Sequence, residues 1–160
     1  MSSQAAVHEG LMGALSRGDP RLLVLCLVPF LLLPLISFAL SRMSGWAVLA
    51  QRYPGSGEPP QPRLRLGYGV FRGWCGYNGC LIVSADQRGL FLSVWPILAI
   101  GHASIHIPWT EVREIRRASL WGRSIYRLIT AQAPDVDFAL LGRAWEFVRP
   151  QAEAARVAIS

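Results

Sequence analysis

One glycine-rich stretch, RGWCGYNGCLIV at residues 72–83, has the composition of a phosphate-binding loop. Its three glycines recur at every third position, as Gly73, Gly76 and Gly79. Phosphate-binding loops place their glycines between a strand and a helix, so that backbone N–H groups face the phosphate. Here a strand-like apolar run follows, the GxGxxG spacing is absent and no lysine follows. The sequence predicts instead a loop between strands, in which glycines adopt positive φ and three side chains stay exposed as contacts: Arg72, Trp74 and Tyr77.

Two cysteines and two histidines make up a zinc-finger-like set of ligands, Cys75, Cys80, His102 and His106. Histidines four apart share one face of a helix, but HASIHIPW alternates as a strand does. Four strand residues at about 3.3 Å each separate the two imidazoles by roughly 13 Å, so one ion reaches both only across a turn. We therefore expect no metal and no cofactor, and metal or thiol chemistry at these four residues is the alternative.

The same two cysteines raise the possibility of a disulfide. A bridge between Cys75 and Cys80 across a turn would persist only in an oxidising compartment. As a nucleophile, either thiol would need a neighbouring base, and no shared spacing ties a histidine to it. We therefore expect a protein that is not an enzyme. A second alternative to the expected function is an extracytoplasmic envelope β domain that contains this disulfide.

A long apolar segment precedes these residues. LLVLCLVPFLLLPLISFALS contains twenty residues without a charge, and a helix of that length spans about 30 Å, the thickness of a hydrocarbon core. Pro29 and Pro34 are tolerated in lipid, with a kink near the middle. A signal peptide cleaved after Ala50 is disfavoured, because the run starts late and exceeds the roughly 7–15 residues of a signal core. We interpret residues 22–41 as one transmembrane helix.

The flanking segments complete the expected membrane part. Residues 1–21 form an N-terminal tail with a weak amphipathic helix that ends at Gly18. After the span, Trp46, Leu49 and Tyr53 stand at helical spacing. Because Trp and Tyr favour the headgroup level, the pattern predicts an interfacial helix at 42–53 with Trp46 and Tyr53 as contacts. The alternative is that both rings pack on the following domain.

A stiff linker, PGSGEPPQP at 54–62, separates this part from a β domain at 63–160. Alternating apolar residues predict seven strands, at 63–71, 80–85, 89–95, 104–108, 112–118, 124–131 and 136–141. GRAWEFVRPQAEAA then predicts a helix interrupted or ended by Pro150. The expected fold class is an N-terminal transmembrane α-helix plus a mainly-β domain, a seven-stranded antiparallel barrel with a C-terminal helix. A β-sandwich seldom closes with such a helix, which here would cap the barrel with Trp145.

Three runs carry a resemblance to a known family: GWAVLAQRYP, GYNGCLIVSADQRGLFLSV and GHASIHIPWTEVREI. Their hallmarks are an Asn-x-Cys strand opening, a D-x-x-G-L-x-L-S-V hairpin and an I-P-W-[ST]-E-V/I passage. Residues 44–118 resemble a group of small uncharacterised bacterial single-pass membrane proteins whose domain is similar to pleckstrin-homology-like (PH-like) or GRAM-like domains. The resemblance implies a fold and no activity. Inositide-binding PH domains carry several basic residues around their first hairpin loop, where this chain has Arg72 alone.

The positive charge points to surface partners. The net charge is +6 and every basic residue is arginine. Beside a membrane span, such charge favours anionic headgroups or a membrane protein over nucleic acid. Five arginines and one turn tryptophan lie close together in the sequence, and we expect contacts at four of these residues: Arg116, Arg117, Trp121 and Arg123. The alternative is a solvated strand face paired with Glu111 and Glu114. Loop arginines slightly favour a bacterial inner membrane protein with a cytoplasmic domain.

Overall fold

The computed structural model describes residues 20–56 and 59–160. Helix α2 (Pro20–Met43) begins the described chain, and the short helix α3 (Trp46–Arg52) follows it. The chain divides into two units between Ile36 and Ser37, so that the C-terminal end of α2 belongs with the β domain. The tail and amphipathic helix predicted before residue 20 lie outside the described residues.

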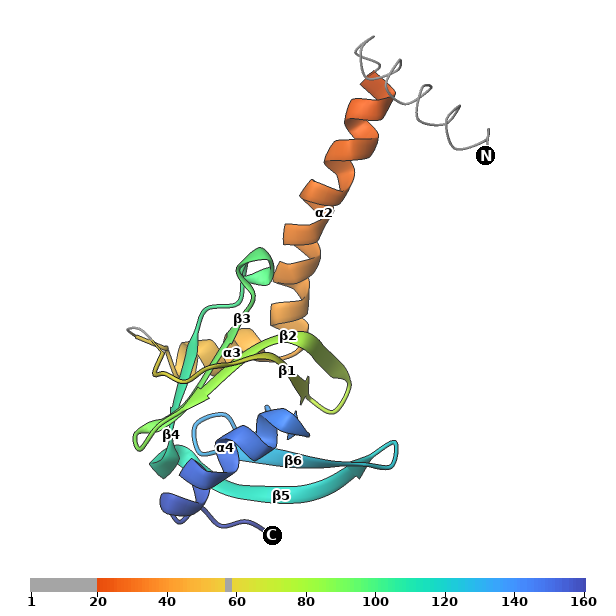
Figure 1. Cartoon of the computed structure of the whole chain (residues 1–160). Helices are drawn as coiled ribbons and strands as arrows, with labels where there is room; N and C mark the ends of the chain where they lie inside the picture. Colours follow the sequence, from red (N-terminus) through yellow and green to blue (C-terminus); the bar gives the residue numbers. More distant parts are fainter. Residues whose placement is uncertain (1–19, 57–58) are drawn as a thin grey trace. The chain divides into compact units, whose positions relative to one another are not determined.

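Seven strands form one curled antiparallel sheet, a half-barrel, in the order β4-β3-β2-β1-β7-β6-β5 (Figure 1). The fold class of a mainly-β domain with seven antiparallel strands and a C-terminal helix is confirmed. The closed barrel is not, because β4 and β5 end the strand order as the two edges of the described sheet. The bounds are β1 (Leu64–Phe71), β2 (Cys75–Ala85), β3 (Gly89–Val94), β4 (Ile105–Pro108), β5 (Val112–Leu120), β6 (Arg123–Thr130) and β7 (Phe138–Leu141).

The glycine-rich stretch is mostly strand. β2 begins at Cys75, five residues earlier than predicted, and only residues 72–74 turn between β1 and β2. Gly73 adopts the positive φ expected of a turn glycine, at 72°. Gly79 also has a positive φ, of 70°, and lies where the β1–β2 register shifts. A bulge of this kind lets a glycine-containing strand continue where the sequence resembles a loop.

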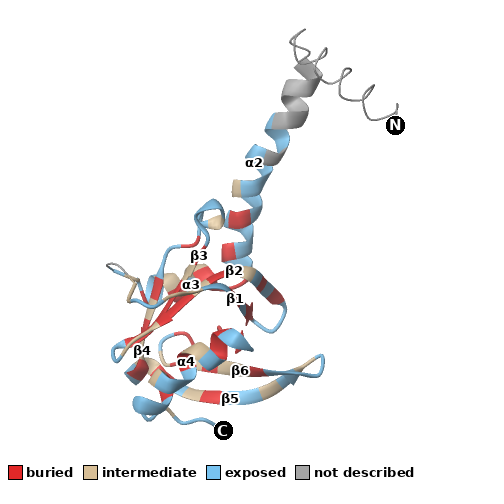
Figure 2. Cartoon of the chain, in the orientation of Figure 1, coloured by how far each residue is buried: buried red, intermediate tan, exposed pale blue. Residues whose placement is uncertain are grey.

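Buried apolar residues of the sheet, of α3 and of the C-terminal helix form the core. Figure 2 marks the buried positions of these elements in red. Phe71 of β1 and Phe138 of β7 stack with ring centroids 5.4 Å apart. Helix α4 (Arg143–Ala154) packs against β1, β2 and β7, and Trp145 stacks on Tyr126 with centroids 4.2 Å apart. The prediction that Pro150 interrupts or ends this helix is wrong. The helix continues through it because its other face is buried, through Ala144, Trp145, Val148 and Ala152.

Helix α3 is a core element. Gly45, at φ 84°, joins it to α2, and the Phe30–Met43 part of α2 makes an angle of 68° with α3. Trp46 and Leu49 are fully buried, and Tyr53 is nearly so. The expected interfacial helix is therefore shorter than residues 42–53 and packs on the domain, which was the alternative interpretation of its aromatic spacing.

Taken one at a time, none of the helices in the described residues has both the length and the apolar composition required to cross a bilayer. Phe30–Met43 and α3 meet the requirement as a bent pair, by length and composition only.

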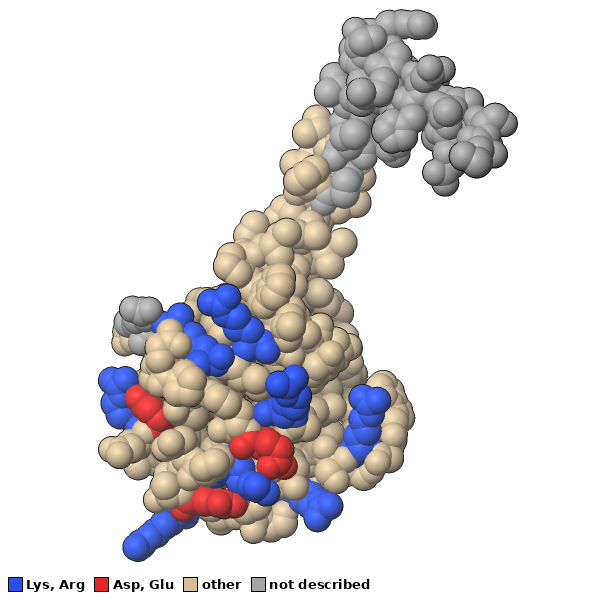
Figure 3. Space-filling view, viewed as in Figure 1, with Lys and Arg blue, Asp and Glu red and all other residues tan. Residues whose placement is uncertain are grey.

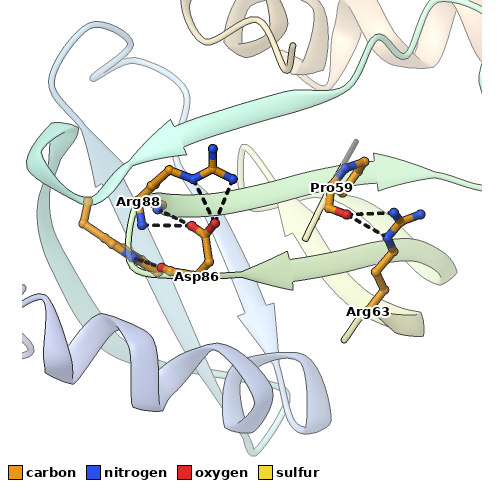
Figure 4. Close-up of polar contacts among 6 residues, drawn as sticks. Pro59, Arg63, Asp86 and Arg88 are labelled. Atoms are coloured by element: carbon orange, nitrogen blue, oxygen red, sulfur yellow. Dashed lines mark hydrogen bonds and ion pairs between the residues drawn. The ribbon is translucent and has the colours of Figure 1, made fainter. Parts of the chain in front are cut away.

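Tight polar contacts fix the turn between β2 and β3 (Figure 4). The Asp86 carboxylate accepts hydrogen bonds from the backbone N–H groups of Arg88 and Gly89, at 2.8 and 3.2 Å. The Arg88 guanidinium donates to the same carboxylate at 3.0 Å. From the η2 turn (Trp109–Glu111), Trp109 Nε1 donates to the Asp86 carbonyl at 2.8 Å. The turn of the D-x-x-G-L-x-L-S-V hairpin thus also anchors the chain after β4.

Candidate functional site

An open groove lies between the β1–β2 and β5–β6 hairpins of the β domain, with a volume of about 1330 Å³. Aromatic side chains stand along it with much of their surface uncovered: Trp121 is 92% exposed, Trp74 58% and Tyr68 49%. Arg123, Arg143 and Asn78 contribute the polar part of its lining. Exposed aromatic rings beside free cations are typical of surfaces that bind another molecule.

The strand register shows why these residues share one face. Tyr68 of β1 lies opposite Asn78 of β2 and Leu141 of β7, and Leu141 lies opposite Ile125 of β6. Side chains directly opposite one another in an antiparallel sheet point to the same side. Ile125 is almost fully buried although it lies outside the main core cluster. It therefore packs on this second face, which has an apolar floor.

The β5–β6 turn holds its tryptophan in an unusual backbone conformation. Trp121 and Gly122 form the two-residue connection between β5 and β6, with φ of 47° and 74°. Positive φ at both positions is the pattern of a type I′ hairpin turn. A bulky residue with positive φ is strained, and such strain concentrates at functional sites. Because nothing buries the Trp121 ring, the fold gains no core contact from this residue.

The arginines around the apolar floor differ in whether a carboxylate pairs with them. Arg116 lies directly opposite Arg127 on β5 and β6. Each has a carboxylate partner, Glu114 for Arg116 and Asp137 for Arg127, which offsets the repulsion between them. The Arg123 backbone pairs with Leu120, but within residues 20–56 and 59–160 no hydrogen bond or ion pair engages its guanidinium. The expected solvated and paired face is thus correct for Arg116, whereas Arg123 remains available to a ligand.

The groove gathers part of the predicted contact set. Trp74, Trp121 and Arg123 line it, and Arg116 shares its sheet face through the register. Arg117 lies opposite Tyr126, on the other side of β5, and donates to Ser124 Oγ at 3.3 Å. In the view of Figure 3, basic side chains are dispersed over the domain and acidic ones lie between them. No single arginine-rich face appears in that view.

Four predicted contact residues instead make contacts within the fold. Trp46, Tyr53 and Tyr77 are 0%, 3% and 6% exposed, so they are core residues rather than surface contacts. The cause is packing: the Trp46 ring lies 5.2 Å from Phe71 and 5.3 Å from Tyr77. Arg72 is exposed, but it donates to the Met43 carbonyl at 3.3 Å. A cation at the last carbonyls of a helix stabilises its C-terminus.

A buried hydrogen-bond network joins the end of α2 to the sheet. Tyr77 Oη lies 2.7 Å from His102 Nε2 and 2.9 Å from Ser44 Oγ. His102 Nδ1 lies 3.3 Å from both the Ile100 carbonyl and Ser37 Oγ. A neutral His102 that carries its proton on Nδ1 satisfies this chain, because Ser44 then donates to Tyr77 and Tyr77 donates to Nε2.

Burial governs the ionisation of this network. It lowers the pKa of His102 below the usual range, more than the Ile100 and Leu98 carbonyls raise it. It also raises the pKa of Tyr77, more than the hydrogen bond with Ser44 lowers it. Both groups are therefore neutral near pH 7. His102 is only 5% exposed, so the serine–histidine contact gives no open nucleophilic site, and we interpret the network as structural.

The cysteines and the second histidine do not converge. Cys75 and Cys80 are free thiols on the same strand. Five strand residues at about 3.3 Å each place their Cα atoms roughly 16 Å apart, well beyond the reach of a disulfide of about 7 Å. Burial raises the pKa of both thiols, which keeps them protonated and weakly nucleophilic. His106 instead stacks on Phe91, with ring centroids 4.1 Å apart.

The proposed ligand set for zinc is likewise dispersed. Over the described part of the chain, no three side chains of histidine, cysteine, aspartate or glutamate are grouped so that they could hold a metal ion. His102 is engaged by Tyr77 and lies in the loop between β3 and β4.

Comparisons with protein-family models, curated proteins and solved structures found no match. The functional interpretation therefore rests on the residues and geometry described above.

Proposed function

We propose that the protein is a non-catalytic, single-pass membrane-anchored binding module with a PH-like domain. The observation that carries the proposal is the apolar surface of α2. Its exposed large apolar residues are Leu27, Val28, Phe30, Leu31, Leu32, Leu33, Leu35, Ile36, Phe38, Leu40 and Met43. Apolar exposure on this scale exceeds what a helix in water carries, and the apolar sequence continues towards the N-terminus as far as residue 22.

The PH-like assignment is supported by topology. A seven-stranded antiparallel sheet in the order 4-3-2-1-7-6-5, followed by a helix that packs on β1, β2 and β7, agrees with the plan that the sequence resemblance implies. Fold alone does not define a ligand. The binding role therefore rests on the groove.

The groove fits a protein segment with apolar and acidic side chains. Trp74, Trp121 and Tyr68 offer apolar ring faces, and Arg123 and Arg143 offer cations for carboxylates. Trp, Tyr and Arg dominate protein–protein binding energies. Anionic lipid headgroups are the second candidate, favoured by the same two arginines.

The proposed location is a bacterial inner membrane, with the β domain on the cytoplasmic side. Support comes from the loop arginines beside the apolar segment, which slightly favour this orientation. A reporter fused to the C-terminus and active on one side of the membrane tests this orientation.

Flotation of the purified full chain with neutral phosphatidylcholine vesicles tests the anchor. We expect the chain to float without any anionic lipid, because α2 inserts through apolar contact. A variant with Leu31→Asp and Leu35→Asp should stay at the bottom of the gradient, whereas the control Gln87→Asp, in an exposed turn, should float. A wild-type chain that floats only with anionic vesicles would show surface adsorption and contradict the anchor.

Photo-crosslinking in native membranes tests the groove. A photoreactive residue at position 121 should give a discrete protein adduct, and the same residue at position 87 should not. Arg123→Glu combined with Arg143→Glu should remove the adduct, because the charge that attracts an acidic segment is reversed. An adduct with lipid alone would favour the headgroup candidate.

A further inference from the structure

The loop between β3 and β4 exposes apolar side chains in an uncharged stretch, WPILAIG at residues 95–101. Trp95 is 42% exposed, Ile97 66% and Ile100 52%. Loops at a water-facing surface are normally polar. The fold accounts for Leu98, which packs against the core, but it gives no reason for the other three side chains to be apolar.

The loop is fastened to the end of α2 by serine side chains. Ser37 Oγ lies 2.8 Å from the Leu98 carbonyl and 3.0 Å from that of Ile100, placed to donate to either. Ser41 Oγ donates to the Gly101 carbonyl. The two serines are four residues apart and share one face of the helix. The loop in turn includes the η1 turn, Pro96–Leu98 (Figure 1).

Close packing makes this attachment tight. A Cβ atom added to Gly101 would lie 3.1 Å from Phe38 Cα, so the glycine lets the loop backbone approach the helix directly. Gly101 also has a positive φ of 79°, which disfavours other residues there. The loop therefore has a fixed position beside residues 37–41.

The helix beside this loop exposes its own apolar residues. Phe38, Leu40 and Met43 are 45%, 39% and 57% exposed. The Arg42 guanidinium lies over the Phe38 ring, 4.9 Å from its centroid. An arginine whose stem and charge lie along an apolar ring at the end of an apolar helix is the arrangement found at the headgroup level of a bilayer.

We infer that the β3–β4 loop is a second membrane-contacting element, which embeds Trp95, Ile97 and Ile100 in the outer acyl region beside α2. The occupant of this surface is lipid, because the loop is joined to the end of the segment proposed as the anchor, where Gly101 packs on Phe38. The inference rests on the proposed membrane anchor. Two contacts, a helix and a loop, would restrict the orientation of the β domain at the surface in a way that a single flexible connection does not.

The test places an environment-sensitive fluorophore at one position of the full chain, through a genetically encoded azide residue, so that the native cysteines are unchanged. The chain is reconstituted in phosphatidylcholine vesicles with a nitroxide near the headgroup end of the acyl chain. Position 97 probes the loop, position 31 reports on the anchor, and position 87 is the control at the opposite end of β3. Iodide in the buffer is the aqueous quencher.

We expect the lipid nitroxide to quench positions 31 and 97 and the iodide to quench position 87. Quenching at 31 by lipid and at 97 by iodide would overturn the loop insertion and leave the anchor intact. A position 97 that neither quencher reaches would also overturn it, in favour of a protein contact. If position 31 is quenched by iodide, the anchor itself fails.

Discussion

The Tyr77 hydroxyl is predicted to stabilise the junction between α2 and the sheet. Tyr77→Phe removes this oxygen and leaves the ring in place, where it contacts Trp46 and Phe71 with centroids 5.3 and 5.0 Å apart. Because the substitution opens no large cavity, its effect isolates the two hydrogen bonds that the hydroxyl makes.

The size of the stability loss follows from the polar groups that lose a hydrogen-bond partner. Each buried hydrogen bond contributes about 1 kcal/mol, and a buried group left without its partner costs about 1–3 kcal/mol. In the variant, His102 Nε2 loses its donor and Ser44 keeps only the Ser41 carbonyl as an acceptor, at 3.4 Å. We expect a loss of about 2–4 kcal/mol in the free energy of unfolding.

Thermal unfolding of the full chain in lipid nanodiscs, followed by tryptophan fluorescence, measures this loss. A loss of 1 kcal/mol lowers the midpoint by about 2–8 °C in domains of this size range. Tyr68→Phe is the matched control, since Tyr68 is half exposed on the groove, and it should leave the midpoint unchanged. A Tyr77→Phe midpoint equal to that of the control would refute the structural role of the network.

Three further outcomes are expected. The free energy of unfolding should fall as the pH drops below about 6.5. Burial lowers the pKa of His102 and His106, so the unfolded chain binds protons more readily than the folded chain. His102→Gln should flatten the pH dependence of the unfolding midpoint. Gly89→Ala should destabilise the fold by about 1–3 kcal/mol in the same assay, since its Cβ would clash with the Ile107 carbonyl oxygen. A wild-type midpoint would refute this contact. Trp121→Ala should change the free energy of unfolding by less than about 0.5 kcal/mol. A larger loss would show that the ring stabilises the fold.

The alternation of apolar residues was enough to locate six of the seven strands nearly to their ends. β2 was the exception, because Gly76 and Gly79 resemble a loop in sequence while the bulge that accommodates Gly79 depends on pairing with β1. The prediction that Pro150 interrupts or ends the C-terminal helix was wrong for a related reason. Its local effect on a helix is unfavourable, but the buried face of α4 compensates through tertiary contacts that no short window contains.

The candidate site was predictable only in part. Trp74, Trp121 and Arg123 belong to turns or their edges, where exposure follows from position. Trp46 and Tyr53 were misplaced because an aromatic residue near a membrane segment has the same local pattern whether it meets lipid or packs on the domain. Tyr77 was misplaced because Gly76 and Gly79 resemble a loop, whereas β2 begins at Cys75. Tyr68 and Arg143 were missed, since only the pairing of β1 with β7 brings them to one groove.

The serine–histidine network and the apolar loop depend on contacts across long stretches of chain. Ser37 and His102 are 65 residues apart, and nothing in their local sequences indicates that they meet. Serines at 37, 41 and 44 do recur with helical spacing on an otherwise apolar helix. That stripe was the available signal of a helix end that packs on protein.

Alkaline carbonate extraction of membranes from cells that express the full chain tests the central claim most directly, since it releases peripheral proteins and leaves anchored ones in the bilayer. The account predicts that the chain stays in the membrane pellet, and that the variant with Leu31→Asp and Leu35→Asp moves to the supernatant. Release of the wild-type chain into the supernatant would contradict the membrane anchor.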